Sequence, residues 1–178
     1  MNCNACERPI RRCVCRFVQR VPTPLNILMI QHADERKHAK NTGTLAAKCL
    51  DIEIVPSHEL THLNWSAAPN ALLFPSIDGV DTVDATELNA NTNIWVIDAT
   101  WRKATRILAE YPELASLPRV TLPASESYWR NRKPKRAGQL ATIEAIAKLH
   151  ECCQYHQISK TLNQVFENFQ IALEQYKS

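Results

Sequence analysis

Four cysteines near the N-terminus carry the most recognisable chemistry of this chain. The first two have the Cys-x2-Cys spacing of many zinc sites, and a Cys-x-Cys pair follows six residues later. Four thiolates complete a tetrahedral zinc shell, and so short a segment has no core of its own to fold it. A redox pair and unpaired thiols are the alternatives. We expect a structural zinc ion bound by Cys3, Cys6, Cys13 and Cys15.

An aspartate follows directly behind the apolar run of residues 94–97, which is typical of a buried strand. Ligands of open α/β sheets bind at the carboxyl ends of strands, so Asp98 is placed for chemistry. Taken alone, the segment favours Asp98 as a cap for the next helix, and the rest of the chain shifts the balance towards chemistry. Thr100 either holds the turn or bonds a ligand. Trp101 offers either a stacking face for a base or a core aromatic ring.

A second polar segment, residues 31–45, follows the apolar run of residues 25–30. Its Asn41-Thr42-Gly43 stretch resembles a helix N-terminus, whose free N–H groups attract a carboxylate or phosphate. His32 and His38 offer a base or an RNA contact. The simpler interpretation of the segment is a solvated loop with a capping threonine.

Basic residues are concentrated in two places, although the net charge is only +3. Most such clusters are solvated surface, but beside aromatic residues and a metal motif they indicate a polyanionic partner. The first cluster is Arg8, Arg11, Arg12, Arg16 and Arg20, and the second is Arg130, Arg132, Lys133, Lys135 and Arg136.

The elements that must position these residues alternate along the chain. Apolar runs predict strands at residues 25–30, 52–55, 71–74, 94–98 and 119–122. Helical periodicity predicts helices at residues 41–50, 101–111, 140–147 and 162–173. Pro112 should end the second helix, and Ser159 should cap the last. This alternation indicates an α/β fold, a mostly parallel sheet with helices on both faces.

The size and composition fit one globular domain of 178 residues with a small appendage, which we place at residues 1–20, ahead of residues 21–178. No apolar run approaches the ~20 residues that cross a bilayer. Cys3 and Cys6 occupy the place of a signal peptide's apolar stretch. We therefore expect a cytoplasmic protein without a membrane partner, and favour a monomer. Three glycines exclude a Rossmann fingerprint and a P-loop.

Taken together, these pieces resemble the DTW-domain family, the tRNA-uridine aminocarboxypropyltransferases, over nearly the whole chain. The order and spacing of several motifs carry the resemblance. They are the cysteine motif with Arg8 and Pro9, Gln31-His32 with Glu35 and His38, Asn41 to Leu45, the name-giving Asp98-x-Thr-Trp with Lys103, Tyr128-x-Arg130, and Gly138 with Thr142-x-Glu144-Ala145. Two positions depart from the family pattern: Ala99 replaces a common glycine, and Ala141 replaces a usual serine or threonine.

The resemblance implies transfer of the 3-amino-3-carboxypropyl group of S-adenosylmethionine to N3 of a tRNA uridine, with release of methylthioadenosine. It also implies a SPOUT-like fold with a trefoil knot, which no sequence pattern could have indicated. The expected catalytic residues are Asp98, Thr100 and Trp101. Cofactor contacts are expected from His32, Asn41, Thr42, Gly43, Leu122, Tyr128, Arg130, Gly138, Thr142 and Glu144, and RNA contacts from Arg132, Lys133, Lys135 and Arg136.

The role of Asp98 has two interpretations. Uridine N3 is a poor nucleophile until it loses its proton, so Asp98 is our candidate base. The same carboxylate could instead bind the amino group of the cofactor. Two other functions remain open: a SPOUT-like RNA methyltransferase using the same cofactor, and a non-catalytic zinc-containing RNA-binding module.

Overall fold

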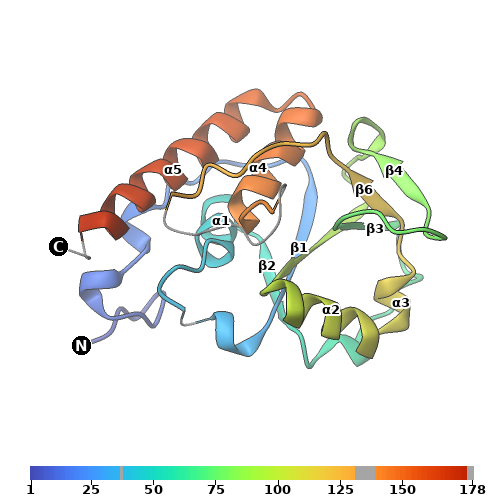
Figure 1. Cartoon of the computed structure of the whole chain (residues 1–178), viewed down its shortest axis with the longest axis horizontal. Coiled ribbons are helices and arrows are strands. Elements are labelled where there is room, and N and C mark those ends of the chain that lie inside the picture. Colours follow the sequence, from blue (N-terminus) through green and yellow to red (C-terminus); the bar gives the residue numbers. More distant parts are fainter. Residues whose placement is uncertain (37, 131–138, 176–178) are drawn as a thin grey trace.

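The computed structural model describes residues 1–36, 38–130 and 139–175, which fold around one six-stranded sheet (Figure 1). The strand order is β2-β1-β5-β3-β6-β4, and all neighbouring strands are parallel. The strands are β1 (Asn26–Gln31), β2 (Glu53–Pro56), β3 (Asn70–Leu73), β4 (Thr82–Asp84), β5 (Asn93–Asp98) and β6 (Arg119–Thr121). The helices are α1 (Gly43–Leu50), α2 (Trp101–Glu110), α3 (Pro112–Ala115), α4 (Thr142–Cys152) and α5 (His156–Gln175). The predicted parallel sheet is confirmed.

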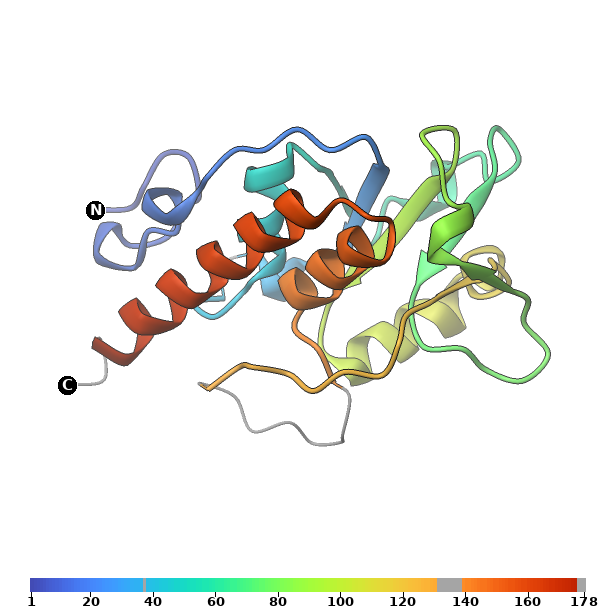
Figure 2. The ribbon, with the colours of Figure 1, turned by 90° about the horizontal axis from the view of Figure 1, so that it is seen from above.

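The central strand β5 buries both of its faces, because successive side chains of a strand point to opposite sides. Ile94 and Val96 pack into one core cluster with α1, α4 and α5. Trp95 and Ile97 pack into a second cluster with α2 and α3. Helices therefore cover both faces of the sheet, as the sequence predicts (Figures 1 and 2).

The chain leaves the neighbouring strands β1 and β5 in opposite directions. After β1 it passes through α1 to β2 on one side, and after β5 it passes through α2 and α3 to β6 on the other. The ends of β1 and β5 therefore form a topological switch point, where open α/β sheets bind ligands. The strand register places Gln31 of β1 beside Asp98 of β5 at this point.

The cysteine segment packs against the helices on one side of the sheet (Figures 1 and 2). Val14 is fully buried, and the ring of Phe17 meets Phe169 of α5 edge-on, with 5.8 Å between centroids. The N–H of Val21 donates to the Cys49 carbonyl in α1 (2.9 Å). The segment thus shares the apolar core that α1 and α5 form.

Three local features differ from the sequence expectations. Strand β4 was not predicted, because it is only three residues long and only its central Val83 is partly buried. Pro112 does follow the end of α2, but it also opens α3, since proline suits the first turn of a helix. Helix α5 begins at His156, so Ser159 lies inside its first turn and does not cap it. None of the helices in the described ranges is long and apolar enough to traverse a bilayer.

Candidate active site

Asp98 lies at the carboxyl end of β5 and is almost completely buried, with 4% of its surface exposed. Its Oδ2 accepts hydrogen bonds from Gln31 Nε2 (2.9 Å) and Asn41 Nδ2 (2.5 Å). Its Oδ1 accepts one from the Thr142 hydroxyl (2.9 Å). The three donors belong to β1, to the segment before α1 and to the first turn of α4. Three distant parts of the sequence therefore meet on one carboxylate.

The donors around Asp98 are fixed by further hydrogen bonds. Gln31 Nε2 also donates to the Thr44 hydroxyl (3.1 Å), and Asn41 Oδ1 accepts the Thr44 N–H (2.7 Å). Asn41 thus satisfies one free N–H at the start of α1 while its amide group reaches Asp98. The segment before α1, the end of β5 and the start of α4 are thus joined through Asn41, Asp98 and Thr142.

Gly43, the first residue of α1, lies directly against the Asp98 side chain. A Cβ on Gly43 would come 2.2 Å from Asp98 Cγ and within 2.5 Å of both carboxylate oxygens. Only glycine allows this close approach. The N-terminus of α1, the positive end of the helix dipole, therefore lies beside the carboxylate.

Burial raises the pKa of the Asp98 carboxyl above its ordinary value, because desolvation disfavours the charged form. Hydrogen bonds from Asn41, Gln31 and Thr142 act in the opposite direction, and the neighbouring Glu35 carboxylate adds to the rise. A raised pKa brings the carboxylate closer to the range in which a general base works near neutral pH.

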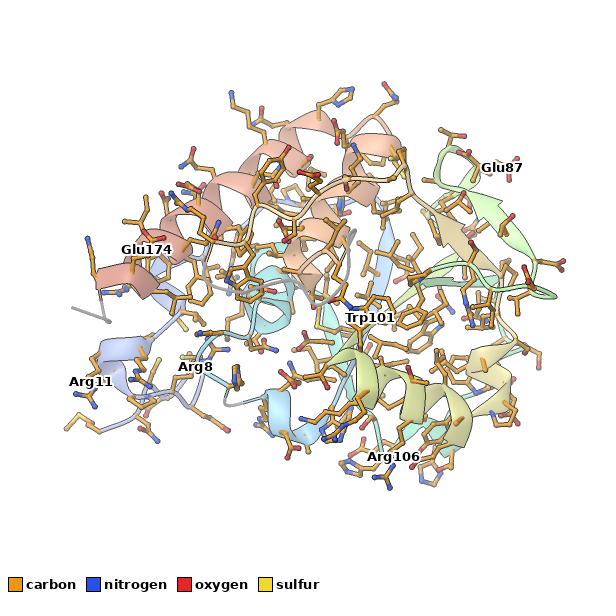
Figure 3. All side chains as sticks on the ribbon, viewed as in Figure 1. Arg8, Arg11, Glu87, Trp101, Arg106 and Glu174 are labelled. Carbon is orange, nitrogen blue, oxygen red and sulfur yellow. The ribbon has the colours of Figure 1, made fainter. Side chains whose placement is uncertain are left out.

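Thr100, not Asp98, caps α2. The Thr100 hydroxyl accepts the Lys103 N–H (3.4 Å), so the capping signal of this stretch belongs to the threonine. Trp101 begins α2, is partly buried, and packs against Phe74 with 5.2 Å between ring centroids (Figure 3). Asp98 is therefore not the cap of α2, because Thr100 supplies that cap two residues later.

Three other expected cofactor residues, His32, Thr42 and Leu122, are not among the side chains that donate to the Asp98 carboxylate. The His32 N–H donates to the Asp98 backbone carbonyl (3.3 Å), and its imidazole accepts the Asp34 N–H (3.2 Å). Thr42 is buried at the start of α1. Leu122 follows β6 and packs, partly buried, on the α1, α4 and α5 side of the sheet.

Glu144 ties the segment before α4 to the start of that helix. Its carboxylate accepts hydrogen bonds from the Ala141 N–H, the Tyr128 N–H and the Ser127 hydroxyl, each 2.7 Å long. Ala141 has no side-chain oxygen to return a bond to the helix, so only half of a capping box forms. The Tyr128 side chain itself is 81% exposed.

Arg130 is held by residues of α5. Its guanidinium pairs with Glu167 and with Glu174 (3.7 Å), and its N–H donates to Gln170 (2.8 Å). The expected contact of Arg130 with a cofactor carboxylate stays a prediction, and it requires the guanidinium to leave these two glutamates. Five other expected site residues lie outside the described residues: Arg132, Lys133, Lys135, Arg136 and Gly138.

Two residues that sequence reasoning did not assign to the site belong to it. Gln31 is a motif residue at a strand end to which the sequence analysis assigns no role, because a sequence does not reveal which strands are neighbours. Arg8 was grouped with the basic surface, yet it is 1% exposed. Its guanidinium donates to the carbonyls of Ala39 (3.5 Å) and Asn41 (3.3 Å). The signal for Arg8 was its place between two cysteine pairs.

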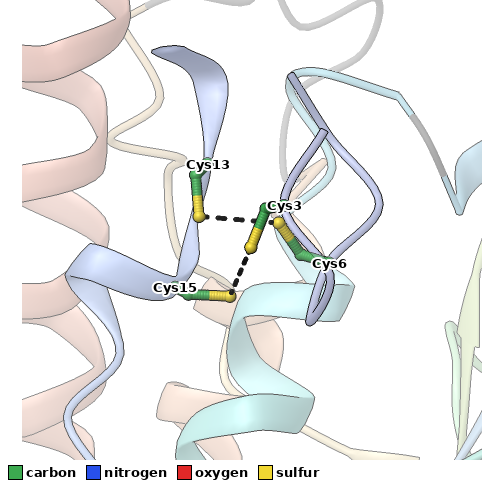
Figure 4. Close-up of side chains that lie close together, drawn as sticks. All are labelled: Cys3, Cys6, Cys13 and Cys15. Carbon is green, nitrogen blue, oxygen red and sulfur yellow. Dashed lines mark hydrogen bonds between the residues drawn. The ribbon is translucent and has the colours of Figure 1, made fainter. Parts of the chain in front are cut away.

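The four N-terminal cysteines form one cluster (Figure 4). All four Sγ atoms lie within 4.8 Å of one another, with 4.0 Å between Cys3 and Cys15 and 3.7 Å between Cys6 and Cys13. Sulfur ligands at the usual distance from tetrahedral zinc are about 3.8 Å apart, so the spacing fits that ion. N–H groups of Ala5 and Cys6 lower the pKa of Cys3 to about 6, whereas burial raises the pKa of Cys13 and raises that of Cys15 to about 12. The cluster can hold a metal ion.

The sequence matches the model of the DTW domain over residues 1–173. This match includes both the cysteine segment and the α/β core. The chain therefore belongs to the DTW domain family.

Two known proteins are similar to the chain. The tRNA-uridine aminocarboxypropyltransferase A of Arabidopsis thaliana is 27% identical over 126 residues, which cover 57% of this chain and 48% of that relative. The chain thus spans about half the length of this curated relative. The fold resembles that of the SAM-dependent rRNA:acp-transferase Tsr3 from Vulcanisaeta distributa, with a TM-score of 0.60 and 16% identity, covering 85% of this chain and 80% of that one. At this identity the likeness concerns the fold.

Proposed function

We propose that the protein transfers the 3-amino-3-carboxypropyl group of S-adenosylmethionine to N3 of a uridine in tRNA and releases methylthioadenosine. The observation that carries the proposal is the buried Asp98 carboxylate, on which three segments of a DTW domain meet at the switch point of the sheet. The name of the Arabidopsis thaliana relative supports tRNA uridine as the acceptor. The name of the Vulcanisaeta distributa protein supports S-adenosylmethionine as the donor.

The protein must above all deprotonate the nucleophile, because the donor is already activated. The sulfonium of S-adenosylmethionine is already electrophilic. Uridine N3 loses its proton to the base and attacks the methionine γ-carbon, so an N–C bond forms. The bond from that carbon to sulfur breaks, and sulfur keeps the electron pair as the neutral thioether of methylthioadenosine. The proton then passes from the base to solvent.

Asp98 is the base in this proposal. Each carboxylate oxygen has two acceptor positions, and among the described residues Oδ1 accepts a single hydrogen bond, from Thr142. Oδ1 therefore keeps a lone pair for the N3 proton. The alternative role, binding the amino group of S-adenosylmethionine, would use the same lone pair. The Asp98→Asn variant considered in the Discussion separates the two roles.

The segments that meet at Asp98 supply the contacts of the donor molecule in this proposal. Trp101, half-buried at the start of α2, stacks on the uracil or on the adenine. Thr100 holds the turn as the cap of α2. The donor contacts are assigned to His32, Asn41, Thr42, Gly43, Leu122, Tyr128, Arg130, Gly138, Thr142 and Glu144, and phosphate contacts to Arg132, Lys133, Lys135 and Arg136.

The metal of the cysteine cluster is assigned as one structural zinc ion, which fixes residues 1–20 as a segment ahead of a catalytic domain of residues 21–178. We further propose the trefoil knot of the SPOUT-like fold, a cytoplasmic location and a monomer. An experimental structure that traces residues 122–142 would test the knot.

The transfer is tested with unmodified tRNA and S-adenosylmethionine labelled either in its methyl group or in its carboxyl group. The proposed reaction moves label into tRNA only from the carboxyl-labelled donor. An RNA methyltransferase would move only the methyl label. A non-catalytic RNA-binding module would retain tRNA and move neither, and either of these results would overturn the proposal.

Gly43→Ala should displace the Asp98 carboxylate, because the new Cβ has no room beside it. We expect the free energy of unfolding to fall by about 1–3 kcal/mol through overpacking. The transfer rate should fall about 10²-fold, the effect of a misplacement of about 1 Å in an active site. Thermal unfolding and single-turnover assays measure both. Gly79→Ala is the control, since nothing lies within 4 Å of a Cβ there and only its φ of +81° strains the backbone. Equal transfer rates in Gly43→Ala and Gly79→Ala would contradict the close approach of Gly43 to the Asp98 carboxylate.

The raised pKa of Asp98 predicts how activity depends on pH. A base must be ionised, so activity falls as the pH drops through the pKa of Asp98, above the value of about 3.9 for an ordinary aspartate. The effect on stability has the opposite sign. Burial favours the neutral acid, so this contribution to stability is present below pH ~4 and is lost as pH rises through the raised pKa. A profile of kcat/KM against pH checks the first point, and a rate that stays flat down to pH ~4 would contradict it.

A further inference from the structure

A cleft of about 320 Å³ separates the cysteine segment from the polypeptide that leads into α1. Arg8, Pro9 and Arg12 line one side, and His38 and Ala39 line the other. No carboxylate is among these lining residues. A larger cavity of about 480 Å³ lies along α5. Its walls contain acidic, basic and neutral polar side chains, and neither the clustered cysteines nor Asp98 lines it.

Arg8 gives this cleft a buried positive charge. Its guanidinium is 1% exposed and donates to the carbonyls of Ala39 and Asn41, while its Nε has no partner among the described residues (Figure 3). A buried charge needs a partner of opposite sign or strong hydrogen bonds. The two hydrogen bonds to neutral carbonyls are long. Arg8 also interacts electrostatically with Asp98 and with three of the cysteines, but none of these groups lines the cleft. Arg8 therefore adds positive charge to one wall of the cleft.

Arg12 and His38 add donors at the mouth of the cleft. Arg12 is exposed and forms no ion pair within the described part of the chain. His38 Nδ1 accepts the Lys40 N–H (3.3 Å), so in the neutral ring the proton lies on Nε2, which is then a donor. Glu7, the acidic neighbour of Arg8, is engaged by Arg36 (2.8 Å). The cleft therefore combines cationic and N–H donors without an opposing carboxylate in its walls.

We propose that this cleft binds a phosphate of the RNA substrate, with Arg12 and His38 as its direct contacts and Arg8 as the positive charge beneath them. The inference rests on the proposed function for the identity of the anion as RNA. The position of the cleft supports this identity. Arg8 holds the carbonyl of Asn41, and the side chain of Asn41 holds the Asp98 carboxylate. A phosphate bound here is joined to Asp98 through Arg8 and Asn41. Arginine is suited to bind a phosphate in a bidentate manner.

The test is the salt dependence of RNA binding, measured by fluorescence anisotropy with unmodified tRNA and with a single-stranded oligouridylate. Arg12→Ala should weaken binding and lower the slope of log affinity against log salt by about 0.7–0.9, the value for one lost phosphate contact. His38→Gln should weaken binding as well. The affinity for S-adenosylmethionine, the zinc content and the unfolding temperature should stay unchanged.

Arg11→Ala is the matched control, since it removes the same charge from the same short 3-10 helix but does not line the cleft. An unchanged slope in Arg12→Ala, or an equal loss in Arg11→Ala, would overturn the proposal. The two proposals fail separately. RNA binding that depends on Arg12, without any group transfer, would refute the proposed function but support the cleft as a phosphate site. Transfer with an unchanged slope would refute the cleft alone.

Discussion

Replacing Asp98 by asparagine is expected to lower the rate of group transfer by about 10²–10⁴-fold, the usual effect of removing a general base. Asparagine has nearly the same shape but accepts no proton near neutral pH. Uridine N3 then keeps its proton and cannot attack the sulfonium donor. The rate constant of a single turnover, measured with saturating tRNA and S-adenosylmethionine, reports this loss directly.

The hydrogen bonds around Asp98 can be kept in the Asp98→Asn variant. An asparagine oxygen in the place of Oδ2 still accepts from Gln31 and Asn41, and its amide then faces the Thr142 hydroxyl. A hydroxyl both donates and accepts, so Thr142 can turn to receive that N–H. The fold should therefore survive, with an unfolding temperature near that of the unchanged protein.

The affinity for S-adenosylmethionine separates the two roles of Asp98. A base leaves this affinity intact in Asp98→Asn, whereas a contact to the donor's amino group lowers it together with the rate. Asp84→Asn serves as the control, because Asp84 caps the short 3-10 helix Ala85–Glu87 and takes no part in the site. Full activity of Asp98→Asn would contradict both roles.

Removal of the metal is expected to unfold the cysteine segment and to abolish transfer. Structural zinc contributes roughly 10–16 kcal/mol of apparent binding free energy, comparable with the stability of a whole domain. Without it, residues 1–20 keep only the packing of Val14 and Phe17 and a few hydrogen bonds, which are too few to hold so short a segment in place. Arg8 would then release the carbonyls of Ala39 and Asn41, and with them the segment that fixes Asp98. The contact of Phe17 with Phe169 would be lost as well.

Metal analysis, thermal unfolding and transfer assays before and after chelation measure these effects. The Cys6→Ser variant should repeat them without a chelator. Cys152→Ser, a change of the same kind outside the cluster, should retain one zinc ion per chain and full activity. Protein purified without chelator that contains no zinc, or a chelated protein that keeps its activity, would exclude this role of the metal.

The arrangement of the fold was largely predictable because it rests on patterns that one sequence contains. The apolar run at residues 94–97 and the polar turn behind it define β5 and the position of Asp98. The four cysteines meet because the two members of each pair are close in sequence and a short loop suffices to join the pairs. The short strand β4 could not be predicted, because it buries too little apolar surface to leave a pattern.

The contacts within the site depended on information that a single sequence does not hold. That Gln31 donates to Asp98 follows from β1 and β5 being neighbours in register. Arg8 looks like any surface arginine until the chain folds back and buries it under the segment before α1. Arg130 illustrates the reverse case, since the motif position predicts a ligand contact while its partners lie on α5.

The most direct test of the proposed function is nucleoside analysis of unmodified tRNA after incubation with the protein and S-adenosylmethionine. The proposed reaction predicts a uridine that carries the 3-amino-3-carboxypropyl group on N3, together with an equal amount of released methylthioadenosine. In the same time, Asp98→Asn should form about 10²–10⁴-fold less of both products. Recovery of unmodified tRNA, or of a methylated base with S-adenosylhomocysteine as the by-product, would contradict it.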